Sequence, residues 1–342
     1  MVSFGYDAGL PVTQYVNGIP MVTGVGYQAS GAVSSYTTGI NTGKNVTTTV
    51  VQDVSLLPRP SQIYATAQAT GLRPFDTLGY GYDGAGNILS IGSDTFVYDN
   101  RSRLTSASFS GLPSQGYTYD RYGNLLSKGA TTYSVFPTTN RLTTAGYDSR
   151  GNVTTNGAET YGYDGLDRQT LHTAGGSTWS YLFDGANERL AKVPPGGGSW
   201  TYTLRDEGNR VVTEYAGATP SRDNVFLGNL AVVSYANSAV GGNGPVWTFY
   251  SSDHLGTPRL VTDISGNTVE TRKSWPYGED ATPPGTFQRL RFALMERDTE
   301  ANRYYDHARS HEFGLGRFLS TDSIQGRTLD PQSWNRYTYA KG

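Results

Sequence analysis

The chain repeats an aromatic residue followed directly by aspartate, and successive aspartates stand 16 to 28 residues apart. A short internal repeat of this kind predicts an array of similar units, each burying its apolar face against its neighbours. A weaker copy at Asp206 lacks the aromatic residue, and we interpret residues 138–142 in the longest gap as a degenerate turn. The full copies are Tyr82-Asp83, Tyr98-Asp99, Tyr119-Asp120, Tyr147-Asp148, Tyr163-Asp164 and Phe183-Asp184.

The residues that follow each aspartate predict a tight turn. An aspartate carboxylate accepts hydrogen bonds from backbone N–H groups a few residues further on, which closes an Asx-type turn. The position three residues after the aspartate requires a positive φ, which glycine adopts without steric cost. Asp167 and Asn187 occupy this position in two copies, and Ser102 fits it least well. We assign turn roles to Asp83, Gly86, Asp120, Gly123, Asp148, Gly151, Asp164 and Asp184.

Aromatic residues before each turn are spaced by two, as in Tyr80 with Tyr82 and Tyr117 with Tyr119. A period of two places both rings on one face of a β-strand. Each unit is therefore predicted to be a β-hairpin. Stacking hairpins side by side buries the rings and covers the strand edges, which a single hairpin cannot do. The expected fold class is all-β, built from tandem antiparallel hairpins.

Composition excludes several classes of protein. Hydrophobic residues make up 36% and charged residues 16% of the chain, which indicates a folded protein rather than a disordered one. The net charge of −2 lacks the basic footprint of a nucleic-acid-binding protein. There is no cysteine and no apolar run long enough for a membrane-spanning helix. The first 12 residues lack a signal-peptide pattern and already contain Tyr6-Asp7, so we expect a longer parent protein.

The repeats, with further motifs behind them, resemble the YD-repeat proteins: bacterial Rhs proteins, the C components of insecticidal toxin complexes, and animal teneurins. The resemblance covers about residues 75–342. It implies a hairpin strip that spirals into a hollow shell, plugged at one end by an Rhs-associated core. For this chain we expect a curved strip or partial shell with a C-terminal plug. The further motifs, in family order, lie at residues 225–228, 253–258 with 262–266, 275–279, 316–324 and 334–339.

Three segments are expected from these patterns. Residues 1–75 are predicted to be divergent N-terminal β-repeats, residues 76–250 the hairpin array, and residues 251–342 the core segment. The chain stops at residue 342, before the stretch with which the family's core continues.

Three hypotheses for function follow from the resemblance. The leading one is a structural shell or scaffold fragment of an Rhs-type toxin or surface protein, which encapsulates or presents a C-terminal effector of the parent protein. The second is a latent aspartyl self-protease that releases this effector. The third is a module that binds carbohydrate or a cell surface. The resemblance also implies a secreted or surface-exposed bacterial protein, with a secretion apparatus or cell-surface glycans as further partners.

The resemblance places self-cleavage among Arg297, Asp298 and a second acid. Two carboxyl groups that share one proton can activate water or polarise an amide. Glu312 stands where the family has its second aspartate, and Asp306 and Asp322 are rival acids nearby. The alternative interpretation is that Arg297 and Asp298 form an ion pair that orders the plug.

Metals and cofactors are not expected. A calcium loop needs several converging carboxylates, whereas Asp120 is followed by Arg121. His307 and His311 are spaced by four but lack the glutamate of an H-E-x-x-H zinc motif. We interpret His254 as a turn residue, because neighbours on a strand point to opposite faces and Asp253 therefore cannot easily pair with it.

Overall fold

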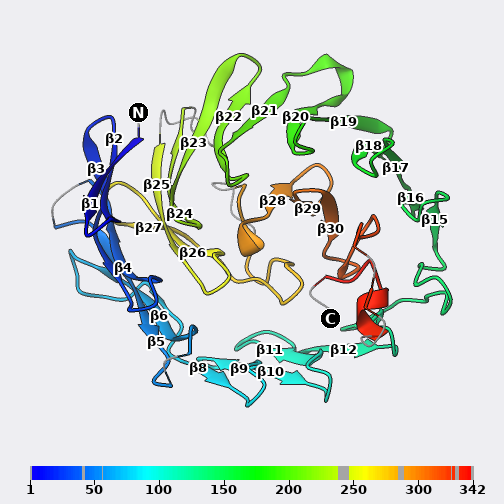
Figure 1. The fold of residues 1–342 in the computed structure, drawn as a ribbon, viewed down its shortest axis with the longest axis horizontal. Coiled ribbons are helices and arrows are strands. Elements are labelled where there is room, and N and C mark those ends of the chain that lie inside the picture. The colour runs from blue at the N-terminus through cyan, green and yellow to red at the C-terminus, as the bar shows by residue number, and fades with distance from the viewer. Residues whose placement is uncertain are drawn as a thin grey trace. The chain divides into compact units, whose positions relative to one another are not determined.

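The computed structural model describes residues 2–40, 43–55, 57–237, 246–283, 289–324, 326–327 and 331–339. Strands make up 52% and helices 3% of the structure (Figure 1). The described strands form four sheets, β1–β7, β8–β14, β15–β27 and β28–β31, in which neighbours along the chain are also neighbours in the sheet. The pairings are antiparallel, and the sheets do not close into a barrel. The predicted all-β class of tandem antiparallel hairpins is therefore confirmed. The last residues of the predicted core segment, 340–342, lie outside the described residues.

The chain divides into two compact units. The first comprises Met1–Ser93, Pro220–Ser274 and Asp280–Leu294, and the second comprises Asp94–Thr219, Trp275–Glu279 and Met295–Gly342. This division rests on spatial contacts. The division into repeats and core segment rests on sequence character and stays a prediction.

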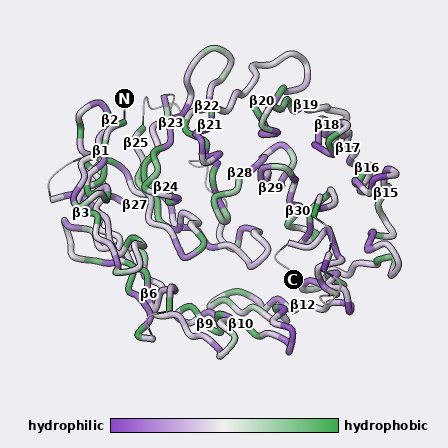
Figure 2. Tube along the Cα trace, in the orientation of Figure 1, coloured by the Kyte–Doolittle hydropathy of each residue, from purple (hydrophilic) through white to green (hydrophobic). Residues whose placement is uncertain are grey.

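The first unit buries a core of aliphatic and aromatic residues from β3, β4 and the β23–β25 strands, including Val22, Tyr36, Val233 and Phe249. Figure 2 shows hydrophobic residues along β24, which alternates little because both of its faces are covered. A short 3-10 helix spans Phe292–Leu294. The strands are β1 (Val2–Asp7), β2 (Leu10–Val16), β3 (Ile19–Tyr27), β4 (Val33–Thr38), β5 (Val46–Gln52), β6 (Pro60–Ala67), β7 (Phe75–Asp76), β8 (Tyr80–Tyr82), β9 (Ile88–Ile91), β23 (Thr219–Leu227), β24 (Leu230–Ala236), β25 (Val246–Ser252), β26 (Pro258–Thr262) and β27 (Thr268–Thr271).

The second unit holds the hairpins β10–β14 and β15–β22, together with the small sheet β28–β31. Short 3-10 helices span Pro195–Gly197 and Pro331–Trp334. The strands are β10 (Asp94–Tyr98), β11 (Leu104–Ser108), β12 (Gln115–Tyr119), β13 (Leu125–Lys128), β14 (Thr131–Thr132), β15 (Ala145–Tyr147), β16 (Val153–Asn156), β17 (Glu159–Tyr163), β18 (Gln169–Ala174), β19 (Ser177–Phe183), β20 (Arg189–Val193), β21 (Thr201–Arg205), β22 (Val211–Ala216), β28 (Glu296–Asp298), β29 (Arg303–Asp306), β30 (Arg309–Glu312) and β31 (Arg317–Phe318).

One turn geometry recurs along the chain. At Asp148, the N–H groups of Arg150 and Asn152 both donate to Oδ1 at 2.9 Å, and the Asn152 amide donates to Oδ2 at 2.9 Å. Gly151 takes a φ of 97°. The same pair of backbone bonds, from the second and fourth residues after the aspartate, forms at Asp83, Asp99, Asp120, Asp164, Asp184, Asp206, Asp253 and Asp263.

Imperfect copies of the turn have the same left-handed backbone conformation. Ser102 adopts a left-handed φ of 59°, although it fits this position least well. In residues 138–142, Asn140 is the residue with the left-handed backbone, at φ 58°. Val135 and Leu142 form an antiparallel β-bridge on the two sides of this turn. The turns at Asp253 and Asp263 were not recognised from the sequence as members of the repeat.

Candidate functional site in the C-terminal sheet

The strands β28–β31, here called the C-terminal sheet, carry all the predicted catalytic residues except Asp322, which follows β31. Side chains alternate between the two faces of a strand, and residues opposite one another on paired strands share a face. Asp298 lies opposite Arg303, and Glu312 lies opposite Arg317, so this row alternates acid and base across four strands. The neighbouring row, on the other face, is Arg297, Tyr304, His311 and Phe318.

Asp298 is held by two cations from the hairpin strand β20. Arg189 donates from Nη1 and Nη2 to the two carboxylate oxygens at 2.5 and 2.9 Å, and Lys192 Nζ lies 3.2 Å from Oδ1. The side chains of Asp298 and Arg189 are each 3% exposed. Burial lowers the pKa of Arg189, but the negative charges of Asp298 and Glu296 have the larger combined effect, so the pKa is raised. A bidentate pair of this kind fixes geometry strongly.

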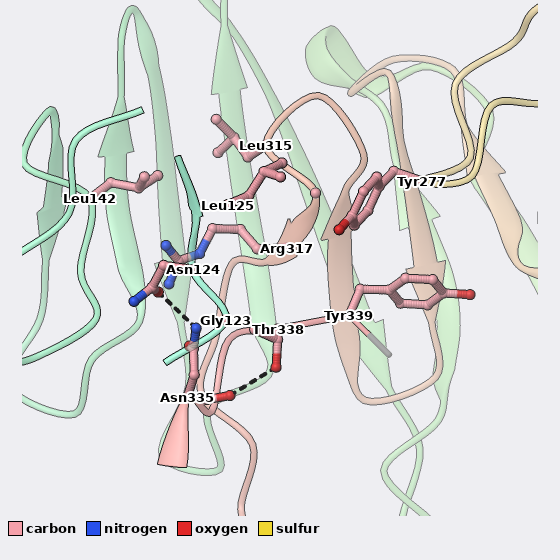
Figure 3. Close-up of a pocket in the computed structure, with 11 residues that line it drawn as sticks. Gly123, Asn124, Leu125, Leu142, Tyr277, Leu315, Arg317, Asn335, Thr338 and Tyr339 are labelled. Atoms are coloured by element: carbon pink, nitrogen blue, oxygen red, sulfur yellow. Dashed lines mark hydrogen bonds between the residues drawn. The ribbon is translucent and has the colours of Figure 1, made fainter. Parts of the chain in front are cut away.

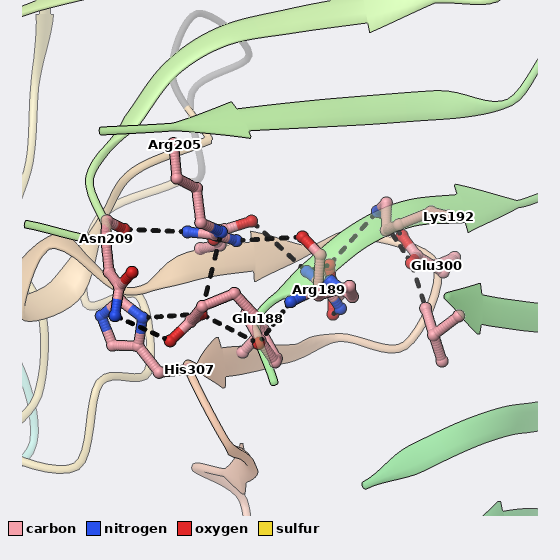
Figure 4. A network of polar contacts seen from close by, with 11 residues as sticks. Glu188, Arg189, Lys192, Arg205, Asn209, Glu300 and His307 are labelled. Carbon is pink, nitrogen blue, oxygen red and sulfur yellow. Dashed lines mark hydrogen bonds and ion pairs between the residues drawn. The ribbon is translucent and has the colours of Figure 1, made fainter. Parts of the chain in front are cut away.

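Further ion pairs lie beside Arg189 and Lys192, as Figure 4 shows. Lys192 Nζ contacts both oxygens of Glu300 at 2.8 Å, and Arg205 pairs with Glu296. His307 Nδ1 lies 3.1 Å from Glu188, and this hydrogen bond raises the pKa of His307. Cations of the β20–β21 hairpin therefore pair with acids of the C-terminal sheet and its first loop, and the Glu188–His307 pair has the opposite arrangement. The network joins the hairpin to the sheet.

Arg297 projects to the other face of β28 and has different partners. Its guanidinium lies over the Phe313 and Tyr304 rings, 4.2 and 4.9 Å from their centroids, and donates to Asn302 Oδ1 at 2.7 Å. Cation–π contacts of a desolvated arginine stabilise the packing of such a face. Arg297 and Asp298 are thus neighbours in sequence whose contacts lie on opposite sides of the sheet.

Glu312 contacts Arg303 at 3.2 Å, and Arg303 also contacts Glu159 at 2.5 Å and Tyr161 Oη at 3.2 Å. Burial raises the pKa of Glu312 against the opposing effect of Arg303. Asp298 and Glu312 lie on either side of Arg303 in the sheet. Two strand spacings, about 10 Å, separate their backbones. Carboxyl groups that share a proton need to lie near 3 Å from each other, so this pair does not form such a dyad.

Asp306 and Asp322 come together at one arginine. Asp306 lies opposite Arg309 in the β29–β30 pairing, and Arg309 Nη2 lies 3.0 Å from Asp322 Oδ2. Burial raises the pKa of Asp306, while His307 and Arg309 oppose this effect. The side chain of Asp322 is 35% exposed, so this cluster reaches the solvent.

The histidines have separate environments. His254 lies in the Asp253 turn, with Nδ1 3.0 Å from Tyr80 Oη. His307 and His311 lie on a β-hairpin instead of a helix. His311 is fully buried beside Tyr304, Phe318 and Tyr339, and burial lowers its pKa to about 3. Within the described part of the chain, no three acids or histidines form a group that would hold a metal.

Arg189, Lys192 and Glu188 were not singled out from the sequence, although they complete the site. Arg189 is separated from Asp298 by 109 residues, and no local pattern links the two.

The described residues also include no helix with the length and apolar character needed to cross a membrane.

The sequence of this chain is similar to part of a known nuclease. The tRNA3(Ser)-specific nuclease WapA of Bacillus spizizenii is 25% identical over 272 residues, which cover 76% of this chain and 10% of that protein. No protein-family model matches the chain.

Solved structures show the same fold. A chain in the crystal structure of TcdB2-TccC3-Cdc42 superposes with a TM-score of 0.80 at 19% identity, over 99% of this chain and 20% of that one. A chain of the Tc holotoxin pore of Photorhabdus luminescens gives 0.81 at 18% identity, with the same shares covered. This chain therefore spans about a fifth of these chains and a tenth of WapA. The predicted resemblance to Rhs/YD-repeat proteins is confirmed.

Proposed function

We propose that this chain, which has the fold of the Rhs-type YD-repeat proteins, is a scaffold that encapsulates or presents a C-terminal effector of its parent protein. The buried network around Asp298 carries the proposal. It uses the candidate catalytic acid to tie the C-terminal sheet to the β20–β21 hairpin, with Arg189 and Lys192 as its partners. Because Asp298 is paired with both cations, its arrangement supports a role in anchoring the sheet.

Apolar packing supports the same role. Leu319, directly after β31, is 1% exposed and packs with Val153 and Tyr161 of the hairpin strands. Tyr337 Oη donates to the carbonyl of Gly151, inside the Asp148 turn, at 2.7 Å. The chain that follows the C-terminal sheet is thus held against hairpins that lie more than 150 residues earlier.

The partner, in this proposal, is the effector that follows residue 342 in the parent protein. Secretion or display at the bacterial surface follows from the same proposal, because an effector of this kind acts on another cell. Tyr117 and Tyr181, two rings of the repeats, are 2% and 4% exposed, so neither is available to stack on a sugar.

The test measures whether this chain shields the downstream polypeptide. The full-length parent is digested with trypsin beside the same downstream polypeptide expressed alone, and cleavage is followed by mass spectrometry. We expect at least tenfold slower cleavage in the parent. Asp298→Ala should speed it, and Arg150→Ala, an exposed change, should not. Equal cleavage rates in both settings would rule out encapsulation.

A second candidate is a latent aspartyl self-protease, favoured by the Asp306–Arg309–Asp322 cluster. Burial raises the pKa of Asp306, and Arg309, which lies opposite Asp306 in the strand pairing, also pairs with Asp322, so two acids in different environments share one arginine. The full-length parent should then undergo one cut, detected by intact mass, that Asp306→Asn or Asp322→Asn abolishes. Asp99→Asn is the matched control, because it alters an acid of a hairpin turn that is 26% exposed and lies outside the cluster. A cut that survives both cluster variants, or no cut in the wild type, excludes this activity.

A further inference from the structure

The last described residues of the chain, 331–339, form a segment that we call the strap. After its 3-10 helix the strap runs beside β31, and Figure 3 shows Asn335, Thr338 and Tyr339 near Arg317 of that strand. Thr338 forms an antiparallel bridge with Arg317. Because β31 is an outer strand of the C-terminal sheet, the strap covers one edge of this sheet.

Backbone hydrogen bonds hold the strap on this edge. The N–H groups of Phe318 and Asp322 donate to the carbonyls of Tyr337 and Arg336, each at 2.9 Å. Both donors belong to the chain under the strap, so they become accessible to water when the strap detaches. Hydrogen exchange at these two amides therefore reports opening of the strap.

His311 of β30 lies under the strap. It is 0% exposed, and its ring centroid lies 4.5 Å from that of Tyr339. The rings of Phe318 and Tyr304, on the two neighbouring strands, flank it at 5.5 and 6.5 Å. Neither nitrogen of the His311 ring has a hydrogen-bond partner among the described residues. A protonated ring would be a buried charge without a partner, which costs much more than burial of the neutral ring.

The other three histidines differ from His311 because each has a polar partner. His172 and His307 each lie 3.1 Å from a glutamate, whose charge would compensate a protonated ring. His254 lies 3.0 Å from a tyrosine hydroxyl. Among the histidines, His311 is therefore the one whose protonation is opposed by its whole environment.

The charges that act on His311 are positive. Burial, followed by the charges of Lys128 and Arg309, lowers the pKa of His311 to about 3. The acids beside these two cations pair with the cations and not with the imidazole. The other charged or titratable groups of the packed elements are Arg297 of β28, Tyr304 and Asp306 of β29, Tyr339 of the strap, Glu279, which pairs with Lys128, and Asp322, which pairs with Arg309.

We propose that His311 makes the strap acid-sensitive, so that a fall from pH 7 to pH 5 detaches residues 331–339 from the C-terminal sheet. With the strap open, the ring is solvated and takes up a proton below about pH 6.5, its ordinary pKa. The closed state excludes that proton until about pH 3. Acid therefore favours the open state, by up to roughly 25-fold between pH 7 and pH 5. The detachment concerns this chain alone, whereas its consequence, that acid frees the chain leading to an effector, rests on the proposed function.

The experiment follows hydrogen exchange by NMR on the full chain at pH 7 and pH 5, with rates corrected for the intrinsic pH dependence of exchange. In the wild type we expect protection of the Phe318 and Asp322 amides to fall by roughly 10- to 25-fold. Protection of the β10–β11 amides in the same unit should change much less, because the strap opens without unfolding the hairpins.

His311→Leu removes the titrating group and should keep the Phe318 and Asp322 amides equally protected at both pH values. If that variant does not fold, His311→Phe, which retains an aromatic ring, takes its place. The matched control is His172→Gln, a change at another buried histidine that keeps a donor for Glu159 and should respond as the wild type does.

Three results would overturn the proposal: unchanged protection of the two amides in the wild type, an equal fall in the β10–β11 hairpin, or a fall in the folded His311 variant as large as in the wild type. A failure of the chain to shield the downstream polypeptide from trypsin would leave these exchange results unaffected. The acid-sensitive strap and the scaffold function can therefore fail separately.

Discussion

The Asp148 turn and the Asp298 network use the same residue type in opposite ways. Asp148 receives its hydrogen bonds from Arg150 and Asn152, within four residues along the chain, in a partly exposed turn. Asp298 receives its bonds from β20, more than 100 residues away, in a buried position. An aspartate of the repeats closes a local turn, whereas an aspartate of the C-terminal sheet joins distant parts of one unit.

The difference determines how much each region contributes to the stability of the fold. Local turns define hairpins one at a time, and each contributes little on its own because solvent competes for its hydrogen bonds. Buried ion pairs stabilise the folded state only when every charge has a partner, and loss of one partner leaves the other charge buried and uncompensated. The hairpin array should therefore tolerate single changes that the C-terminal sheet does not.

The largest expected effect is that of Asp298→Ala. Removing the carboxylate leaves Arg189 and Lys192 buried without their partner, which should lower the free energy of unfolding by about 3–5 kcal/mol. The measurement is urea unfolding followed by tryptophan fluorescence. Asp148→Ala is the matched change in a turn and should cost about 1–2 kcal/mol through its lost hydrogen bonds. Equal costs for the two variants would break the comparison.

The next effect compares two turn glycines. Alanine at Gly86 meets no atom within 4 Å and carries only the cost of a left-handed backbone, about 1–2 kcal/mol. At Gly151 the added Cβ would lie 2.8 Å from Tyr337 Oη and 3.0 Å from Thr321 Cγ2. Gly151→Ala should therefore cost about 1–2 kcal/mol more than Gly86→Ala in the same unfolding assay. If Gly86→Ala is the more costly, the C-terminal chain does not pack on the Asp148 turn.

The pH dependence of the free energy of unfolding should show that His311 is buried in its neutral form. Its folded-state pKa is lowered to about 3 by burial and by the charges of Lys128 and Arg309, against an unfolded value near 6.5. The unfolded chain alone therefore gains this proton as the pH falls below 6.5, and stability decreases. Between pH 7 and pH 5 the wild type should lose about 1–2 kcal/mol more than His311→Leu. Parallel pH profiles for the two proteins would show that His311 is not buried as described.

The smallest effect belongs to Arg150→Ala. Arg150 joins its turn to the next one through the carbonyls of Asp164 and Gly165 and an ion pair with Asp167. Its side chain is 42% exposed, so the loss should stay below about 1 kcal/mol and shrink further in high salt. A loss as large as that of Asp298→Ala would show that contacts between turns, and not the buried network, dominate stability.

The sequence predicted the features whose causes lie within a few residues. Aromatic spacing and the Asp-x-x-Gly pattern predicted hairpins, and the all-β class followed from them. The turns at Asp253 and Asp263 carry the same turn signal, with Gly256 and Gly266 three residues on, but Ser252 and Thr262 stand where the repeat has its aromatic residue. The aromatic–aspartate pattern therefore did not predict them.

The candidate site was predictable only in part. The resemblance located Asp298, Glu312 and Asp306 on one segment, but the partners of Asp298 come from β20, which no local pattern connects to it. Whether a carboxyl group acts as an anchor or as an acid depends on those distant cations. Burial of Arg317 and His311 likewise depends on long-range packing, which residue type alone does not reveal.

Hydrogen–deuterium exchange of the C-terminal sheet tests the central claim, that this sheet is anchored to the hairpin strands, most directly. In the wild type, amides of β28–β30 should exchange as slowly as those of β20 and β21, since opening one region exposes the charges of the other. Asp298→Ala should accelerate exchange in both regions together and leave the β10–β11 hairpin unchanged. Exchange of β28–β30 within seconds in the wild type, while β20 and β21 stay protected, would contradict the account.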